Sequence, residues 1–331
     1  MRSTVRRLSV LLAGSTVALV ASAGVAQADP AAAPAAGDLV GVGSDTSEHV
    51  LNALSTAYNA TGPAAKLYSW DATGASPLTP KAGCAAINRP NGSGAGINAL
   101  IADGNAHCID FARSSRGPQG TEAQNYAFVE FARDSLSYVT SKNSRVPGTL
   151  TTQALHDLYA SAAGSAACSF TAYLPQAGSG TRSFFLTSIG LTEVTKGSCA
   201  KDSWSGGEVQ EHNPDAIKAD VNALAPFSVG RAIPFAADIR GNSVDDSVNP
   251  GTRNTIATVN PANAQTPAPG EASIKAYDRA LYNVVRRADL DTDNYLGVFG
   301  SIGWICADPA AAGQVAANGF RLSDNCGVLA G

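Results

Sequence analysis

Three loops rich in glycine and serine carry the residue types best suited to chemistry in this chain. They are Gly41-Val42-Gly43-Ser44-Asp45-Thr46, Gly92-Ser93-Gly94-Ala95-Gly96 and Gly178-Ser179-Gly180-Thr181, and each precedes a helical pattern. A glycine-rich turn that opens a helix exposes unpaired backbone N–H groups and the positive end of the helix dipole. Hydroxyl groups add further donors. We expect the loops to share one anion site, although each alone is also typical of a helix N-cap or a turn.

A fourth polar loop, Arg113-Ser114-Ser115-Arg116, follows the apolar segment 109–112 and stops at Gly117-Pro118. Together the four loops define the expected ligand-binding residues: Ser44, Asp45, Thr46, Ser93, Ser115, Arg116, Ser179, Gly180 and Thr181. Three neighbours are further candidates: Arg113, Ser114 and Arg182. We assign no catalytic residue.

The loops depart from the common nucleotide and hydrolase motifs. No Gly-Lys dipeptide exists, so the phosphate loop of ATPases is excluded. The dinucleotide fingerprint needs a third Gly or Ala where this chain has Thr46, Ile97 and Ser183. The loops also lack the Gly-x-Ser-x-Gly elbow of serine hydrolases. A cradle of hydroxyl and amide donors remains.

The first 28 residues have the pattern of a cleavable signal peptide. Three arginines, Arg2, Arg6 and Arg7, precede an uncharged apolar stretch and the small-x-small site Ala26-Gln27-Ala28. Cleavage would leave Asp29 first, so there is no lipobox cysteine. Residues 29–37 are rich in Ala and Pro and are predicted to be a disordered leader. We expect a protein exported to the periplasm or the extracellular space.

Charge and hydropathy limit the classes of partner that we expect for this protein. Without the signal peptide the chain carries 20 basic and 27 acidic residues, a net charge of −7. An acidic balance argues against nucleic acid as a partner, although a small anion can still bind oriented dipoles in a closed cleft. No apolar run of spanning length follows the signal, so no membrane span is expected in the mature chain. We expect a monomer.

Six cysteines in an exported chain indicate disulfides. They form three couples close in sequence, and pairing neighbours costs the least loop entropy: Cys84–Cys108, Cys168–Cys199 and Cys306–Cys326. There is no Cys-x-x-Cys motif and the four histidines are scattered, so we predict no metal site and no cofactor.

Short apolar segments, glycine turns and amphipathic helices alternate from Asp38 onward, which predicts an α/β fold. The loop order then resembles that of the phosphate-binding substrate-binding proteins of ABC importers, in the type II periplasmic binding protein superfamily. The resemblance lies in Gly41 to Thr46, Gly92 to Ile97, Asp110-Phe111-Ala112-Arg113-Ser114-Ser115 and Gly178 to Thr181, and continues in Ala223 to Arg231 and Arg279 to Val284. It covers roughly Asp38 to Gly331; Tyr68 to Arg89 and Gly241 to Gly270 match poorly.

Three anion-reading positions depart from the family pattern. This chain has Asp45 where the family has a hydroxyl residue, Ser115 where the family has an Asp that accepts the phosphate proton, and Pro175 where the family has an Arg. Asp45 is able to accept that proton instead, or to serve only as a helix N-cap. The missing guanidinium would come from Arg113, Arg116 or Arg182, unless these are surface residues. The anion site is therefore divergent.

The resemblance implies a two-lobed α/β fold of periplasmic-binding-protein type II with an interlobe ligand cleft. We expect lobe 1 over residues 38–132 and 240–331, and lobe 2 over 133–239. The function implied is capture of phosphate or a similar small oxyanion, for uptake with an ABC permease. Two alternatives stay open: a secreted binder of another small ligand without a transporter, and an extracellular phosphatase or hydrolase.

Overall fold

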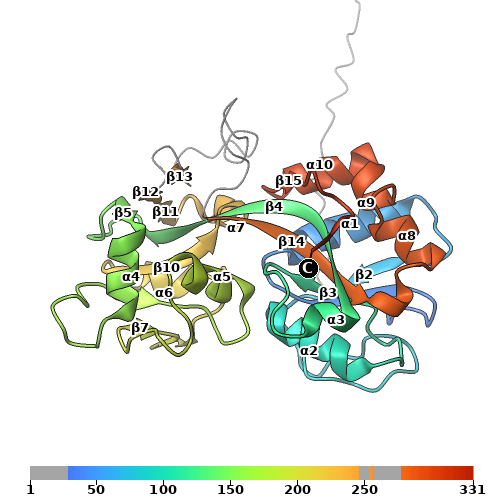
Figure 1. Ribbon diagram of the computed structural model, residues 1–331, viewed down its shortest axis with the longest axis horizontal. Helices are drawn as coiled ribbons and strands as arrows, with labels where there is room; N and C mark the ends of the chain where they lie inside the picture. The colour runs from blue at the N-terminus through green and yellow to red at the C-terminus, as the bar shows by residue number, and fades with distance from the viewer. Residues whose placement is uncertain (1–28, 246–252, 256–276, 331) are drawn as a thin grey trace, which may run out of the picture.

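The computed structural model describes residues 29–245, 253–255 and 277–330. The expected signal peptide, residues 1–28, lies outside the described residues, as does most of the segment 241–270. The chain forms two α/β lobes side by side, joined by two long strands that cross between them (Figure 1). The expected fold class is confirmed.

Lobe 1 contains the N-terminal and C-terminal parts of the chain. Its elements are β1 (Leu39–Gly43), α1 (Glu48–Ala60), β2 (Leu67–Ser69), α2 (Ser93–Asp103), β3 (Phe111–Ser114), α3 (Glu122–Asn125), β14 (Asp278–Arg286), η2 (Arg287–Asp289), α8 (Asp293–Phe299), α9 (Trp304–Ala307), α10 (Pro309–Ala317), β15 (Arg321–Leu322) and β16 (Leu329–Ala330). Its sheet has the order β2-β1-β3-β14-β4. Strands β1, β2 and β3 are parallel and β14 is antiparallel to β3.

Lobe 2 is built from the middle of the chain. Its elements are β5 (Thr149–Thr151), α4 (Thr152–Ala160), β6 (Thr171–Tyr173), α5 (Gly180–Ser188), β7 (Ala200–Lys201), β8 (Ser203–Trp204), β9 (Gly207–Glu208), α6 (Asp215–Lys218), β10 (Ala223–Ser228), α7 (Val229–Ala232), η1 (Ile233–Phe235), β11 (Ile239–Gly241), β12 (Ser243–Asp245) and β13 (Arg253–Thr255). Its main sheet has the order β4-β10-β6-β7.

Strand β4 (Tyr126–Ser141) belongs to both sheets. Residues 126–135 pair with β14 in lobe 1, and residues 136–140 pair with β10 in lobe 2. The junction between the lobes thus falls inside one continuous strand, at Ser135 and Leu136. The chain crosses back from lobe 2 to lobe 1 where β14 begins, at Asp278.

The sequence pattern explains the packing of each sheet. In β1, Leu39 packs in one apolar cluster with α1 residues Val50 and Leu51, whereas Val40 and Val42 point to the opposite face, toward α2. Alternation along a strand sends successive side chains to opposite faces, so both faces of this sheet are buried under helices. Lobe 2 likewise has one apolar cluster on each side of its sheet.

Both expected boundaries of lobe 2 differ from the arrangement of the strands, because residues 133–135 still pair with β14 in lobe 1 and the strands of lobe 2 extend past residue 239. Strand β11 pairs with the lobe 2 half of β4, and β12 pairs with β5, so lobe 2 continues beyond residue 239, at least to residue 245. The chain returns to lobe 1 with β14. Polar composition at 241–270 suggested a loop of lobe 1, but β11 pairs with the lobe 2 half of β4, and β12 and β13 form a separate three-stranded sheet with β5.

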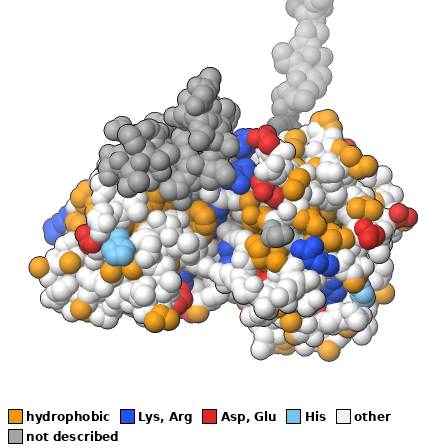
Figure 2. Space-filling view, in the orientation of Figure 1, with side chains coloured by type: hydrophobic (Ala, Val, Ile, Leu, Met, Phe, Trp, Pro, Cys, Tyr) orange, Lys and Arg blue, Asp and Glu red, His pale blue; other side chains and the backbone are white. Residues whose placement is uncertain are grey.

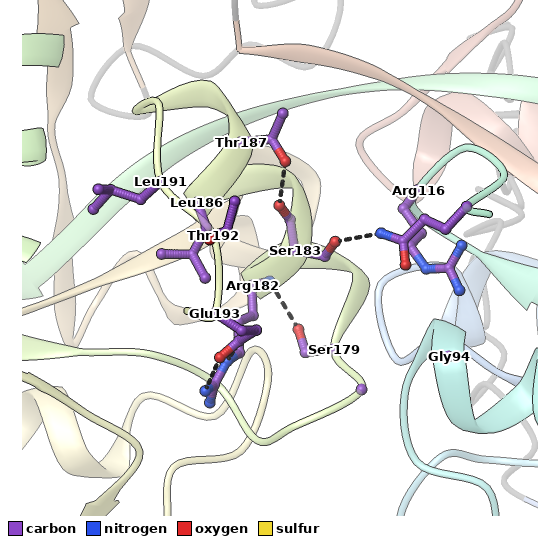
Figure 3. Close-up of a pocket in the computed structure, with 12 residues that line it drawn as sticks. Gly94, Arg116, Ser179, Arg182, Ser183, Leu186, Thr187, Leu191, Thr192 and Glu193 are labelled. Carbon is purple, nitrogen blue, oxygen red and sulfur yellow. Dashed lines mark hydrogen bonds and ion pairs between the residues drawn. The ribbon is translucent and has the colours of Figure 1, made fainter. Parts of the chain in front are cut away.

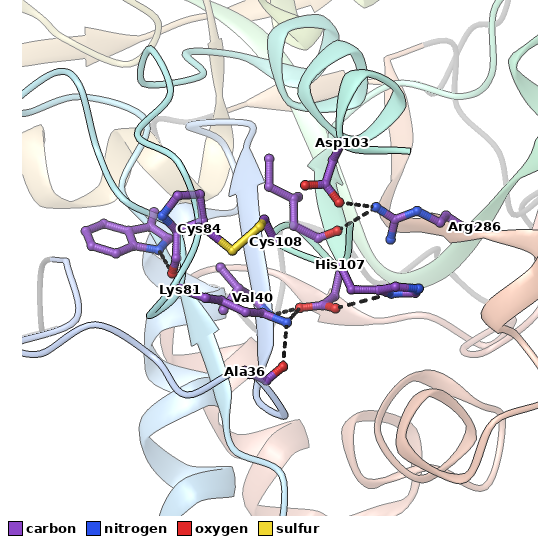
Figure 4. Close-up of a disulfide and its surroundings, with 12 residues drawn as sticks. Ala36, Val40, Lys81, Cys84, Asp103, His107, Cys108 and Arg286 are labelled. Carbon is purple, nitrogen blue, oxygen red and sulfur yellow. Dashed lines mark hydrogen bonds and ion pairs between the residues drawn. A yellow bond between two sulfur atoms is a disulfide. The ribbon is translucent and has the colours of Figure 1, made fainter. Parts of the chain in front are cut away.

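Residues 29–37, expected to be a disordered leader, lie against lobe 1. Asp29 forms an ion pair with Arg89, with Oδ2 2.6 Å from Nη2. Further along, the Lys81 ammonium donates to the Ala36 carbonyl oxygen (Figure 4). Specific polar contacts therefore hold an Ala/Pro-rich segment whose composition alone predicts no order.

The three predicted disulfides, Cys84–Cys108, Cys168–Cys199 and Cys306–Cys326, are confirmed. Two of these disulfides lie in lobe 1 and one lies in lobe 2. Figure 4 shows Cys84–Cys108 beside Lys81. The Lys81 ammonium forms a buried ion pair with Asp110, with Nζ 2.7 Å from Oδ2. No helix among the described residues is both long and apolar enough to cross a bilayer.

Candidate functional site

The hydroxyl groups of three lobe 1 loops converge at the cleft. The Ser44 hydroxyl donates to Ser115 Oγ at 3.2 Å, and Ser93 Oγ lies 3.3 Å from the same atom. All three side chains are buried. Strands β1 and β3 are adjacent and parallel, so their carboxyl ends deliver these loops to one edge of the sheet.

Lobe 2 brings its own loop to the same place. Thr181 Oγ1 lies 3.2 Å from Thr46 Oγ1, and the Gly94 N–H donates to the Gly178 carbonyl oxygen at 3.0 Å. A Cβ on Gly180 would lie 2.2 Å from Ser93 Oγ and 2.3 Å from Ser115 Oγ. A side chain at this position would have to displace both hydroxyl groups. The two lobes are thus closed on each other at the hydroxyl cluster, which we define as Ser44, Thr46, Ser93, Ser115 and Thr181.

Glycine is also required where the second and third loops cross. Gly92 has a φ of +105°, and a Cβ there would meet the Gly178 carbonyl oxygen at 2.6 Å. Beyond it, Ser179 is the N-cap of α5: its Oγ accepts from the Arg182 N–H at 3.0 Å. The capping interpretation therefore holds for Ser179, whose oxygen is already used within its own helix.

Arg279, at the start of β14, has a guanidinium that donates to a hydroxyl group of the cluster. Its Nη2 donates to Thr46 Oγ1 at 3.3 Å and its Nη1 to the Ser115 carbonyl oxygen at 3.4 Å. The same side chain is paired with Asp134, at 2.8 Å. This residue was not among the expected site residues, although the Arg279-Ala280-Leu281-Tyr282 resemblance was a signal pointing to it.

Asp45 does not face the hydroxyl cluster as a free acceptor. Its Oδ1 lies 3.0 Å from Nη2 of Arg231, which comes from α7 of lobe 2. Burial raises the pKa of Asp45 to about 6, against the opposing effect of the Arg231 charge. Neighbouring Glu48 lies 3.8 Å from Arg231. Burial acts to raise its pKa, but hydrogen bonding to His49 and the positive charge of Arg231 lower it to about 2.

Glu211, which sequence reasoning missed, is the carboxylate that contacts the cluster. Its Oε1 accepts from the Thr46 hydroxyl at 2.7 Å, while its Oε2 has no hydrogen-bond partner among the described residues. Its backbone N–H donates to Oε1 of Gln176 at 2.7 Å, which fixes the residue in place. No sequence motif marks this position.

His212, the next residue, is fully enclosed. Its Nε2 accepts from the Ser228 N–H at 3.1 Å, and its Nδ1 lies 3.5 Å from Asp45 Oδ1. Burial lowers the pKa of His212 to about 3, so the ring is neutral near pH 7. A neutral ring adds no positive charge to the cleft.

The three arginines expected to supply a guanidinium have other partners. Arg113 is buried in lobe 1 and donates to backbone carbonyl oxygens of Gly43, Ser44 and Trp70 and to Ser69 Oγ. Arg116 makes a bidentate pair with Glu122, with both N···O distances 2.8 Å. Arg182 pairs with Glu193 in the same manner, at 2.6 and 2.7 Å. The Ser114 hydroxyl likewise turns away and donates to the Arg116 carbonyl oxygen.

Arg116 and Arg182 instead line a cavity of about 330 Å³ at the outer part of the cleft (Figure 3). Gly94 and Ser179 border it, and the Gln119 amide bridges the lobes by donating to Ser183 Oγ at 2.9 Å. In the space-filling view, basic side chains are visible near the junction of the lobes with acidic groups beside them (Figure 2). Because Glu193 lines the same cavity as Arg116 and Arg182, the cleft combines both charge signs and is not simply basic.

Comparisons with known proteins agree with this architecture. The PBP superfamily domain matches residues 28–278. The chain therefore belongs to the PBP superfamily. No curated protein sequence matches it.

Two solved structures share the fold. One, from Clostridium perfringens, is described as a phosphate ABC transporter substrate-binding protein with bound phosphate: 17% identity, 87% of this chain and 100% of that chain covered, TM-score 0.57. The other is an ABC-type phosphate transport receptor from Vibrio cholerae: 17% identity, 86% and 100% covered, TM-score 0.54. At these identities the likeness concerns the fold alone.

Proposed function

We propose that this protein is an exported solute-binding protein that captures a protonated tetrahedral oxyanion, such as hydrogen phosphate, at the hydroxyl cluster. Lobe 1 contributes Ser44, Thr46, Ser93 and Ser115, and lobe 2 contributes Thr181 with the N-terminal turn of α5. Slight separation of the lobes would present these donors to a ligand, and closure would enclose it. The ligand would then pass to an ABC-type permease.

The observation that carries the proposal is Glu211 beside the cluster. A fully ionised anion there would lie close to a carboxylate, and like charges about 4 Å apart repel by roughly 4 kcal/mol near a protein surface. In hydrogen phosphate part of this cost is offset, because its O–H can donate to the Oε2 of Glu211. Glu211, and not Asp45, is thus the proposed proton acceptor, since Asp45 is held by Arg231.

The balance of charge at the site also bears on which anion can bind. Arg279 reaches Thr46 Oγ1, so it stands next to the proposed ligand position. Its charge is shared with Asp134, which leaves the site without a strong excess of positive charge. Such a site favours an anion of modest charge that also donates a hydrogen bond.

Calorimetry on ligand-stripped protein tests the proposal. Phosphate and arsenate should bind, whereas sulfate, which carries no proton near pH 7, should not. Glu211→Gln should weaken phosphate binding by about tenfold or more, the effect of one charge-assisted hydrogen bond, and should reduce the discrimination against sulfate. Asp202→Asn, a change at a carboxylate next to Arg182, is the matched control. Absence of any phosphate heat at millimolar concentration would overturn the proposal.

A second candidate keeps the fold and changes the ligand. Because Arg279 and Arg231 are both paired and Glu211 has an unpaired oxygen, a neutral or zwitterionic ligand that donates hydrogen bonds also fits, in a secreted binder without a transporter. Heat from a neutral sugar panel without heat from phosphate would select it. Hydrolysis is disfavoured because Nε2 of His212 accepts from the Ser228 N–H and is not positioned to act as a base on a cluster hydroxyl.

A further inference from the structure

A second cavity, of about 390 Å³, lies in lobe 1 and contains none of the cluster residues. Three elements form its walls: the outer edge of β2, one face of α1 and the N-terminal segment 30–33. Its volume falls within the roughly 300–1,000 Å³ of small-molecule sites. The question is which chemistry its walls recognise.

The first wall of the cavity is the backbone at the edge of the sheet. Strand β2 is the outermost strand of its sheet. The Leu39 N–H donates to the Lys66 carbonyl oxygen and the Trp70 N–H to the Gly41 carbonyl oxygen, so residues 66, 68 and 70 face β1. Because hydrogen-bonding direction alternates along a strand, Leu67, Ser69 and Asp71 direct their N–H and C=O groups outward.

Side chains already satisfy two of these three residues. The Asn59 amide both donates to the Leu67 carbonyl oxygen and accepts from the Leu67 N–H, each at 2.8 Å. The Asp71 N–H donates to Asp29 Oδ1, and Arg89 donates to the Asp71 carbonyl oxygen. Between them, the backbone N–H and C=O of Ser69 have no partner among the described residues, and Ser69 lines the cavity.

Helix α1 adds a polar stripe to the opposite wall. Asn52, Ser55, Thr56 and Asn59 follow the i, i+3, i+4, i+7 spacing of one helix face and all line the cavity. Asn52 and Ser55 are only 5% and 6% exposed, yet Asn52 Oδ1 and Ser55 Oγ have no hydrogen-bond partner. The Asn52 Nδ2 donates to Asp71 at 2.6 Å, which assigns Oδ1 as the unpaired acceptor. Buried polar atoms without partners are costly and call for an explanation.

We propose that this cavity is a second binding site, for a short peptide in extended conformation. One peptide unit pairs with the N–H and C=O of Ser69, as an added strand does at a sheet edge. A small rotation of the Asn52 and Ser55 side chains then offers an acceptor and a hydroxyl to the next peptide unit. Pro30 and the alanines 31–33 form an apolar wall that suits small side chains, and the exposed Lys66 lies at the cavity to pair with a terminal carboxylate.

Nuclear magnetic resonance on uniformly ¹⁵N-labelled protein spanning residues 29–331 tests this site. N-acetyl-trialanine with a free carboxylate is the probe, added to millimolar concentration. The Ser69 amide should shift, and its hydrogen exchange should slow in proportion to occupancy. An unchanged Ser69 amide would overturn the proposal, as would a Ser69 response to glucose in place of the peptide.

Three variants locate the binding. Ser55→Leu fills the cavity and should raise the Kd for trialanine at least about tenfold. Ala60→Leu adds the same side chain to an exposed position of α1 outside the cavity and should leave the Kd unchanged. A shortened chain that begins at Pro34 removes the apolar wall and should also lose the peptide, which covers the case of a Ser55→Leu variant that does not fold. Equal affinity for all three would contradict the site, and their phosphate binding should match that of the parent protein.

Discussion

Arg231 reaches across the cleft to Asp45, with Nη2 3.0 Å from Oδ1, and both side chains are buried. One residue belongs to α7 of lobe 2 and the other to the first glycine loop of lobe 1. The contact joins the lobes directly, beside the cluster. Closure therefore depends in part on the protein's own ion pair.

Removing one partner of this pair should be costly. Arg231→Met leaves the Asp45 carboxylate buried without its guanidinium, and breaking a buried pair in this way costs about 3–5 kcal/mol. The double variant Asp45→Asn/Arg231→Met should regain part of that loss. Urea unfolding measures all three free energies. Arg321→Met is the control because its partner Asp324 is 83% exposed, and its cost should stay below about 1 kcal/mol. Equal costs for Arg231→Met and Arg321→Met would show that the cleft pair does not form.

His212 should make the protein less stable as the pH falls. Burial lowers its pKa from 6.5 to about 3, so the folded state binds fewer protons than the unfolded state between these values. Stability supplied by the neutral ring is thus present above pH 6.5 and is lost toward pH 3, with a slope of up to about 1.4 kcal/mol per pH unit.

The comparison of parent protein and His212→Gln isolates this effect. Glutamine keeps an acceptor for the Ser228 N–H but does not titrate. Asp45 acts in the opposite direction in the same range, because its pKa is raised from 3.8 to about 6 and its contribution is lost as the pH rises. Asp45 remains in both proteins, so the difference between their unfolding free energies should shrink as the pH drops. Parallel curves from pH 7 to pH 4 would refute the assignment.

Gly180→Ala should impair ligand binding while leaving each lobe folded. The added Cβ would collide with Ser93 Oγ and Ser115 Oγ across the cleft, so the lobes cannot close fully. Overpacking costs about 1–3 kcal/mol, which predicts a loss of phosphate affinity of roughly 5- to 150-fold. Gly297→Ala is the matched control, because nothing lies within 4 Å of a Cβ there. Calorimetry that gives the same Kd for both variants would contradict the closed arrangement.

The Cys306–Cys326 disulfide should stabilise lobe 1. It spans a sequence separation of 20 residues and fixes short helix α9 to the segment before β16. Replacing both cysteines by serine should lower the free energy of unfolding by about 3 kcal/mol, from the greater chain entropy of the unfolded state. Denaturant unfolding under non-reducing conditions measures the loss. A reducing agent breaks all three disulfides, so it should lower the stability of the parent protein by more than that of the double variant, and the excess should equal the loss measured for the variant.

Much of the fold could be predicted from local patterns in the sequence. Glycine loops before helices, the alternation at Leu39 to Gly43 and the spacing of the cysteines are all readable in short windows of sequence, and they lead to the observed elements and disulfides. Ser44, Thr46, Ser93, Ser115 and Thr181 meet as expected because the loops follow strands whose ends share one edge.

Residues brought together by the junction between the lobes were harder to foresee. Glu211 has no motif, and it reaches Thr46 only because the lobes close. The pairing of two arginines with carboxylates could have been predicted from the sequence. Glu122 lies six positions after Arg116, and Glu193 lies eleven positions after Arg182. A carboxylate so near in sequence competes for a guanidinium with any ligand. Sequence reasoning located the donors of the cleft but not the distribution of its charges.

Strand β4 gives the molecule one further property. Its backbone hydrogen bonds continue from the lobe 1 sheet into the lobe 2 sheet without a break, at Ser135 and Leu136. Rotation of the lobes must then be absorbed as twist of a single strand, whose pairing on both sides resists it. Unfolding of either sheet would remove hydrogen bonds from β4, which is also a strand of the other sheet. The two lobes should therefore lose their structure in one calorimetric transition, as a single cooperative unit.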